Sequence, residues 1–351
     1  MFIGKLCLSL KRHLSLVATL ACLCFSIAIS STPASAWDRG AVQTFAVLPS
    51  GVPMVEGLTV GPDGNVYVAT FNPTGSGQAQ LLVFNPQGQL LKHHFIQGSS
   101  SAMLGLGFRP GTDTLMVIDF GHGKVLTVNP DTGQASDCVT VTGSSGLNAM
   151  AFDAAGNIYV SDSFQGIIWT NSNPRSICGP AKPWVTSDLL KPGNGIPPFG
   201  ANGLGFNKAG TTMFVANTAM DWIVKIPVAG GNPGTPEVFT NSINGADGLI
   251  LDRNDNLWVA ANQADEIVVV DPSGKAIAKL GDFNGVQNGV TNGLLFPASP
   301  AFSKDGQTLY VTNLELDLTT IGLPQSVDSQ WAAEVQRHSI AKLGASIPPI
   351  H

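Results

Sequence analysis

A phrase of two short apolar strands joined by a polar turn recurs along this chain. One copy, DGLILDRNDNLWVA, begins at Asp247. The other copies begin near Glu56, Leu104, Asn148, Asn202 and Ser299. From Glu56 onward the copies open 48, 44, 54, 45 and 52 residues apart. Self-similarity at about 40 to 50 residues, with room for four strands in each unit, is typical of a β-propeller. The sequence therefore predicts an all-β fold, a six-bladed β-propeller.

The last repeat contains one strand fewer than the others. After its first two strands only 335–343 reads as a further strand, whereas 41–48 reads as a strand that precedes the first full repeat. A ring has to be closed, because an unpaired edge strand invites aggregation. We therefore expect 41–48 to supply the outer strand of the last blade, within a propeller domain that spans 37–351.

The first 36 residues do not share the repeat pattern. Basic residues precede an apolar run over 14–29, and a stretch of small residues ends at Ala36. This arrangement is typical of a secretory signal peptide, and the apolar run is short for a membrane span. We expect 1–36 to be a signal peptide cleaved after Ala36, and the protein to be periplasmic or extracellular, with no membrane association after cleavage.

Two cysteines lie outside this leader, Cys138 in the second repeat and Cys178 in the third. These repeats would form neighbouring blades. In an oxidising compartment the two residues either form a disulfide or serve as two small buried hydrophobes.

Each repeat opens with a residue that lies immediately before an inner strand, so the openers should surround one mouth of the central channel. Four of them carry a side-chain oxygen: Glu56, Asn148, Asn202 and Asp247. Hard oxygen donors on a rigid mouth favour Ca²⁺ or Mg²⁺ over metals that prefer sulfur or imidazole. Alternatively, Asn and Asp bond the backbone at strand starts, but this reading does not account for Glu56. We predict one divalent cation bound by these four residues, with calcium favoured over magnesium.

The remaining openers are Leu104 and either Ala298 or Ser299. We expect Leu104, Ser299 and Asn148 to contact a substrate bound at the same mouth. Two insertions, 174–199 and 314–333, interrupt the regular spacing of the repeats. Loops of this length are often functional, so each is either a lid over the mouth or a surface decoration.

The same phrases resemble those of the senescence-marker/gluconolactonase family, from about residue 41 to the C-terminus. The resemblance lies in a Glu-Gly motif at Glu56, an Asn-Gly motif at Asn202, an Asp-Gly motif at Asp247, and Asn148 in the third blade. It implies a six-bladed propeller in which Glu56, Asn202 and Asp247 bind a metal and Asn148 lies beside metal and substrate. It also implies lactone hydrolysis, with the cation polarising the carbonyl and Asp247 as the candidate general base.

The chain also departs from the family pattern. Many relatives follow the blade-three asparagine with an aspartate, which here is Ala149, and related paraoxonases carry a blade-two histidine where this chain has Leu104. We therefore expect one metal and no histidine-dyad mechanism. Asp119 and Asp162, each read as following a second strand, are either substitutes for the missing base or simple turn residues.

Three functions fit these observations. The first is an exported, divalent-metal-dependent hydrolase of a lactone or related ester. The second is a non-catalytic propeller that binds a small molecule, a glycan or a protein and uses the cation structurally; Ala149 favours it. The third is an enzyme of the strictosidine-synthase type, which needs a catalytic glutamate near a pocket. A formal net charge of −6 at pH 7 without a basic stripe argues against nucleic acid. We expect a monomer whose partner is a small-molecule substrate.

Overall fold

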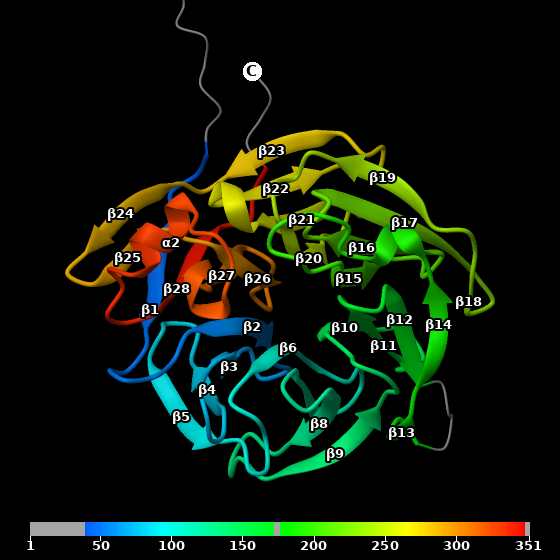
Figure 1. Cartoon of the computed structure of the whole chain (residues 1–351), viewed down its shortest axis with the longest axis horizontal. Helices are drawn as coiled ribbons and strands as arrows, with labels where there is room; N and C mark the ends of the chain where they lie inside the picture. The colour runs from blue at the N-terminus through cyan, green and yellow to red at the C-terminus, as the bar shows by residue number, and fades with distance from the viewer. Residues whose placement is uncertain (1–38, 172–175, 348–351) are drawn as a thin grey trace, which may run out of the picture. The chain divides into compact units, whose positions relative to one another are not determined.

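The computed structural model describes residues 39–171 and 176–347. Six sheets surround a central axis, and each contains a four-stranded antiparallel ladder (Figure 1). The predicted all-β, six-bladed propeller is confirmed. The predicted signal peptide, 1–36, lies outside the described residues.

The innermost strand of each blade is short and largely buried. Each contacts the inner strands of the two neighbouring blades, and the last contacts the first, which closes the ring. In order, the inner strands are β2 (Val55–Val60), β6 (Met103–Phe108), β10 (Leu147–Phe152), β15 (Ala201–Phe206), β20 (Ala246–Leu251) and β26 (Pro297–Phe302).

The second strands are buried on both faces, because each packs against the sheets on either side. They are β3 (Val66–Thr70), β7 (Leu115–Asp119), β11 (Ile158–Asp162), β16 (Thr212–Asn217), β21 (Leu257–Ala261) and β27 (Thr308–Asn313). A large side chain at a matched position of these strands wedges against the next blade. Tyr67 meets Phe108 at 4.9 Å between ring centroids, and Trp258 meets Phe302 at 5.4 Å, both edge to face. These aromatic side chains are therefore part of the core between blades.

The third and outer strands complete the ladders. The third strands are β4 (Gln80–Phe84), β8 (Lys124–Val128), β12 (Ile167–Asn171), β17 (Trp222–Ala229), β22 (Glu266–Val270) and β28 (Ser339–Gly344). The outer strands are β5 (Leu90–Phe95), β9 (Ala135–Thr140), β14 (Lys182–Thr186), β19 (Glu237–Asn241), β23 (Ala276–Leu280) and β1 (Gln43–Val47). Strand β1 pairs antiparallel with β28, so the N-terminal strand supplies the outer strand of the last blade, as predicted (Figure 1).

Every pairing of an inner strand with its second strand contains a β-bulge at the same place. In blade five, Ala246 pairs with Ala261 and the next pair is Leu249 with Val259, so the opener Asp247 lies in the bulge. The other blades show the same shift. A bulge re-aims the side chain it contains, and here it holds the opener at the channel mouth in each blade.

Close packing between neighbouring blades explains why a glycine follows the opener in blades one and five. A Cβ atom on Gly57 would lie 2.1 Å from the carbonyl oxygen of Leu104, and one on Gly248 would lie 2.4 Å from that of Ala298. Neighbouring inner strands approach too closely there for a side chain. In the Glu-Gly and Asp-Gly dipeptides, the first residue therefore faces the mouth and the second permits the blades to meet.

Cys138 and Cys178 form a disulfide. Cys178 precedes the short strand β13 (Gly179–Pro180), which runs parallel to β9 and extends the sheet of blade two. The bond therefore ties the first insertion back to the preceding blade.

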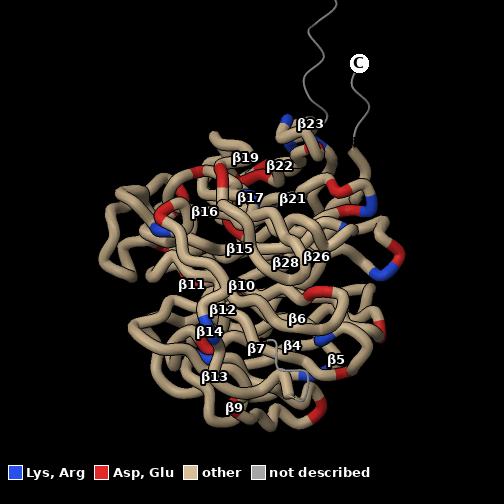
Figure 2. Tube along the Cα trace, turned by 90° about the vertical axis from the view of Figure 1, so that its right-hand side faces the viewer, with Lys and Arg blue, Asp and Glu red and all other residues tan. Residues whose placement is uncertain are grey.

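The other short elements decorate the ring. Strand β18 (Asn232–Pro233) pairs with β17, and β24 (Phe283–Gln287) forms a hairpin with β25 (Val290–Gly293). The helical segments are η1 (Asp188–Leu190), η2 (Asn262–Ala264), η3 (Leu318–Ile321) and α2 (Val327–Ala332). None of these described helices has the length and apolar character needed to cross a membrane. On the face shown in Figure 2, acidic and basic residues are dispersed, without a basic stripe.

Candidate functional site

A cavity of about 400 Å³ opens at one mouth of the channel. All four oxygen-bearing openers line it and are at most 5% exposed, and the fifth predicted residue, Leu104, also lines it. The bulges therefore bring together Glu56, Asn148, Asn202 and Asp247 from blades one, three, four and five.

Several oxygens at this mouth are buried without a hydrogen-bond partner. They are Glu56 Oε2, Asn148 Oδ1, Asp247 Oδ1 and Asn262 Oδ1, and no other buried side-chain nitrogen or oxygen in the described ranges is left in this state. Buried polar atoms are nearly always paired, so a cluster of unpaired ones calls for an explanation. All four are acceptors and all belong to residues that line one cavity, which is the donor set that a hard cation requires.

Hydroxyl groups fix the orientation of the two asparagine openers. The amide nitrogen of Asn148 donates to Ser163 Oγ at 3.2 Å, and that of Asn202 donates to Thr218 Oγ1 at 2.9 Å. The two hydroxyls in turn donate to backbone carbonyls of the next blade, at 2.7 and 2.8 Å respectively. Because each amide nitrogen is engaged, the amide group is held in one orientation. These bonds do not use the amide oxygen, which therefore remains an acceptor.

Asp247 has an equivalent support. Asn262 donates from Nδ2 to Asp247 Oδ2 at 3.0 Å, which leaves Oδ1 of both residues unpartnered. Asn262 was not among the residues predicted from the sequence, yet it lines the cavity and carries one of the orphaned oxygens.

The supporting residues occupy one position of the repeat, directly after the second strand. In blades three to five they are Ser163, Thr218 and Asn262, and we call this side of the mouth the polar half. In blades six, one and two the same position holds Leu314, Phe71 and Phe120, and we call this side the apolar half. A comparison of the residue after each second strand would have revealed both sets in the sequence.

Burial governs the two carboxyls of the site. Burial raises the pKa of Asp247 to about 7, and hydrogen bonds with Asn262 and Asn202 oppose this rise. Burial also raises the pKa of Glu56 well above its usual range, and the negative charge of Asp247 raises it further. Two buried carboxyls that disfavour each other's ionisation would both be stabilised as anions by a shared cation.

The described ranges contain no cluster of three or more His, Cys, Asp or Glu side chains suited to a metal. This finding agrees with the geometry, because only two of the candidate ligands, Glu56 and Asp247, are carboxylates and the others are amides. Oxygen donors of mixed charge fit calcium or magnesium and do not fit metals that prefer nitrogen or sulfur.

Ser299 does not line this cavity, so the structure does not bring it together with the other predicted site residues. The bulge in blade six makes Ala298 the opener and turns Ser299 toward a separate cavity of about 270 Å³ farther along the channel. The Ser299 backbone N–H donates to Thr312 Oγ1 at 2.9 Å. A shift of one residue along a strand reverses the face that a side chain occupies.

Asp119 and Asp162 are structural, which settles the choice left open by the sequence. Each is the last residue of its second strand and is fully buried, and neither lines the cavity. Asp119 accepts bonds from the Ser100 backbone N–H and from His122 Nδ1 at 2.8 Å. Asp162 accepts from Gln165 Nε2 at 2.8 Å and Trp169 Nε1 at 3.0 Å. Neither carboxylate has a free oxygen to act as a base in this site.

Both insertions contribute walls to the cavity. The first supplies Pro197, Pro198 and Phe199, and the second supplies Leu314, Leu316, Ile321 and Leu323. The second is anchored by Glu315, whose buried carboxylate accepts bonds from His338 Nδ1 at 2.6 Å and from Ser339 Oγ at 3.2 Å. The insertions are therefore parts of the mouth and not surface decoration.

Solved structures of similar fold extend over most of the chain. A luciferin-regenerating enzyme has a TM-score of 0.61 at 14% identity, covering 89% of this chain and 97% of that one. Regucalcin from Agrobacterium tumefaciens strain C58, described as a calcium-binding protein, has a TM-score of 0.58 at 18% identity, covering 85% and 94%. A gluconolactonase from Xanthomonas campestris has a TM-score of 0.59 at 14% identity, covering 90% and 92%. At these identities the likeness shows a shared fold.

The sequence matches no curated protein. The family model described as the SMP-30/Gluconolactonase/LRE-like region matches residues 112–313, more than half of the chain. These residues include three of the four oxygen-bearing openers, and the expected family resemblance is confirmed. The chain is a member of the SMP-30/gluconolactonase/LRE-like family.

Proposed function

We propose that this protein is an exported hydrolase of a lactone or related ester, and that it binds a divalent cation through Glu56, Asn148, Asn202 and Asp247. The cluster of orphaned buried oxygens at the channel mouth carries the proposal. Family membership supports the reaction class, and the relatives of similar fold include a gluconolactonase and a calcium-binding protein. Calcium is favoured because its coordination accepts carboxylate and amide oxygens in irregular geometry. The orphaned oxygen of Asn262 makes it a further candidate ligand.

Hydrolysis of a lactone consumes one water. The water oxygen bonds to the carbonyl carbon, the ring carbon–oxygen bond breaks, and the departing oxygen takes a proton to give a hydroxy acid. A bound divalent cation supplies Lewis-acid polarisation of the carbonyl oxygen and lowers the pKa of water.

Asp247 is the candidate general base. It lines the cavity, its Oδ1 has no hydrogen-bond partner within the described residues, and a carboxylate in this place can accept a proton from water. Asn262 holds the carboxylate in orientation through the bond to Oδ2. The neighbouring openers Asn148 and Asn202 are fixed by hydroxyls of their own blades, so the polar half is organised before substrate binds.

The disulfide between Cys138 and Cys178 supports export, since such bonds persist in oxidising compartments. With the leader read from the sequence, it favours a periplasmic or extracellular location. Among the described residues no Lys or Arg side chain lines the cavity, and its size suits a small molecule.

The test is hydrolysis of a panel of lactones by the purified protein, with and without a chelator, and with calcium or magnesium restored. We expect turnover that the chelator abolishes, that calcium restores, and that Asp247→Ala lacks. Asp113→Ala, at an exposed turn of blade two, is the matched control and should keep full turnover. Turnover indifferent to chelator would contradict the cation's role. Cation binding without turnover of any lactone would favour the non-catalytic binding propeller.

A further inference from the structure

We infer that the substrate carries a long alkyl chain or an aromatic group on its lactone or ester, and that a polyhydroxylated sugar lactone is a poor substrate. This inference rests on the proposed function and concerns the same cavity. It follows from the contrast between the polar half and the apolar half of the cavity mouth.

The apolar half continues into a cluster of phenylalanines. Phe71 lies 6.1 Å from Phe120 between ring centroids, and Phe120 lies 5.9 Å from Phe164. Phe164 stacks on Phe199 at 5.8 Å with an interplanar angle of 26°. All four rings line the cavity. They come from blades one, two and three and from the first insertion, so they form one continuous aromatic surface.

The rest of the apolar lining is mainly aliphatic. The second insertion contributes the aliphatic side chains of Leu316, Ile321 and Leu323, and the ring of Phe296, which precedes the inner strand of blade six, lies with them in the cavity lining. Leu316 and Phe296 are at most 3% exposed, so this wall is already packed.

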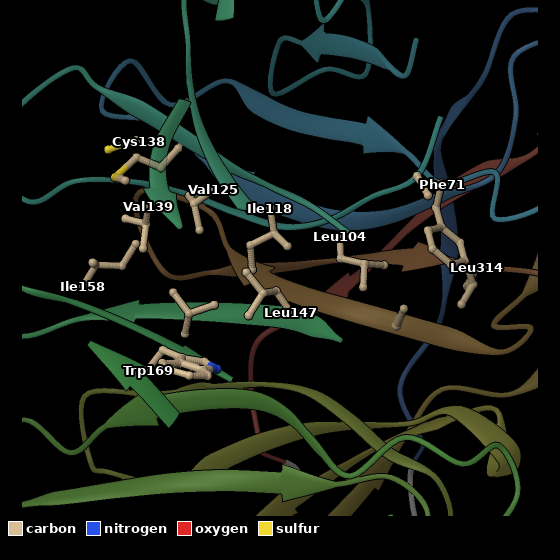
Figure 3. Packing of buried hydrophobic residues seen from close by; sticks show 14 of the residues in the cluster. Phe71, Leu104, Ile118, Val125, Cys138, Val139, Leu147, Ile158, Trp169 and Leu314 are labelled. Atoms are coloured by element: carbon tan, nitrogen blue, oxygen red, sulfur yellow. The ribbon is translucent and has the colours of Figure 1, made fainter. Parts of the chain in front are cut away.

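The apolar half is also part of the protein core. Phe71, Leu104 and Leu314 belong to a buried cluster that extends through blade two to Cys138, as Figure 3 shows. Because these side chains are fixed by packing, the apolar wall exists before a ligand arrives. A preformed apolar pocket binds an apolar group without the cost of ordering its own walls.

The cavity offers few partners to a substrate rich in hydroxyls. Its lining includes no Lys, Arg or His side chain from the described ranges, and outside the polar half and Glu56 its polar side chain is that of Thr74. Each substrate hydroxyl buried here without a partner would lose its hydrogen bonds to water. A methylene group in the same place would gain from leaving water.

The two halves also predict an orientation. The reacting carbonyl would lie over blades three to five and beside Glu56, where the orphaned oxygens gather. The apolar group would then extend over blades six, one and two, between the phenylalanine cluster and the second insertion.

A series of δ-lactones with methyl, propyl, pentyl or heptyl side chains tests this inference against D-glucono-δ-lactone, which has the same ring size. We expect kcat/KM to rise about fourfold for each added methylene, the equivalent of about 0.8 kcal/mol, until the cavity is filled. D-glucono-δ-lactone should fall at least about a hundredfold below the pentyl compound. Equal or better turnover of the sugar lactone, or no dependence on chain length, would overturn the inference.

Phe164→Ser supplies the matched variant. Phe164 is 46% exposed, so the variant should fold, and Phe95→Ser on outer strand β5, 59% exposed, is the control. We expect Phe164→Ser to lower kcat/KM more for the heptyl lactone than for the methyl lactone, so that the chain-length dependence flattens. Phe95→Ser should leave this dependence unchanged. An equal loss for every lactone would indicate a general structural effect and count against the assignment.

Calorimetric binding of the corresponding alkyl δ-lactams, which resist hydrolysis, separates this inference from the proposed reaction. Lactam affinity that rises with chain length, without turnover of any lactone, would uphold the apolar ligand and reject the hydrolase. Lactone turnover without chain-length dependence in either assay would uphold the hydrolase and reject the apolar ligand.

Discussion

The polar half and the apolar half of the mouth occupy the same position of the repeat and differ only in side chains. In blades three to five, the residue after the second strand is hydrogen-bonded to its opener: Ser163 and Thr218 each accept a bond from an asparagine opener, and Asn262 donates one to Asp247. In blades six, one and two, the same position holds Leu314, Phe71 and Phe120, which join the hydrophobic core or pack against it. The same backbone geometry therefore places side chains that hydrogen-bond the openers on one side of the ring, and side chains that pack in the core on the other.

The comparison singles out the two carboxylates. Asp247 lies in the polar half and is held by Asn262, whereas Glu56 lies in the apolar half beside Phe71, in the first blade. Glu56 Oε2 has no partner within the described protein. We conclude that Asp247 is positioned by the fold, and that Glu56 depends more strongly on a bound cation.

Replacing either carboxylate is expected to have the largest effect. Asp247→Asn and Glu56→Gln should each lower calcium affinity by more than about a hundredfold, because the loss of a direct ligand exceeds the loss of an outer-shell contact. Calcium binding is measured by calorimetry, and turnover should fall in parallel.

Without calcium the same two variants should unfold at a higher temperature than the wild type. Each removes a buried carboxyl whose ionisation the folded state disfavours near neutral pH. Stabilisation in the absence of calcium together with weaker calcium binding is a pattern that a general packing defect does not give. Variants that are less stable under both conditions would refute the proposed role.

Much of the mouth could be predicted from the sequence, because the repeat period and the openers are local patterns. Glu56, Asn148, Asn202 and Asp247 follow from their place before each inner strand, and the ring closure by 41–48 follows from counting strands. These features need no knowledge of side-chain contacts.

The rest depends on register, which the sequence leaves uncertain by one residue. Asp119 and Asp162 end their strands and face away from the cavity, whereas the following residues, Phe120 and Ser163, belong to the mouth. The bulge likewise separates Ala298 from Ser299. Phe71 and Leu314 read as ordinary core residues, since their second role as a cavity wall exists only once the blades are assembled.

Placing a polar residue in the apolar half should strongly destabilise the protein. Phe71→Asn removes a buried ring that is 6% exposed and places an amide in the hydrophobic cluster. We expect a loss of about 3 to 5 kcal/mol in the free energy of unfolding, measured with denaturant. Phe71→Leu is the control and should cost much less, because it keeps an apolar side chain. Equal stability of the Asn variant and the wild type would show that the two halves are interchangeable.

The reverse exchange, Thr218→Val, should have a smaller effect on stability. It keeps the shape but leaves Asn202 Nδ2 and the Ala246 carbonyl without their partner. We expect a loss of about 1 to 3 kcal/mol and calcium affinity about tenfold lower, in the range typical of outer-shell residues. Thr218→Ser retains the hydroxyl and should behave as the wild type. Val and Ser variants with equal calcium affinity would exclude a positioning role for this hydroxyl.

Asp265 joins the two halves, and its titration gives an effect that is confined to part of the pH range. Its carboxylate accepts a bond from the backbone N–H of Phe296 at 2.8 Å, so blade five contacts the apolar wall of blade six. Burial raises the pKa of Asp265 to about 7, and the negative charge of Asp328 adds to the rise. A carboxyl whose pKa is raised on folding stabilises the protein at low pH, and that contribution is lost as pH increases from about 4 to about 7.

Asp265→Asn keeps the acceptor and removes the titration. Relative to this variant, the wild type should lose about 1 to 3 kcal/mol of unfolding free energy between pH 4 and pH 8. If the unfolding free energies of the wild type and Asp265→Asn changed in parallel with pH, the contact between Asp265 and Phe296 would not make stability depend on pH.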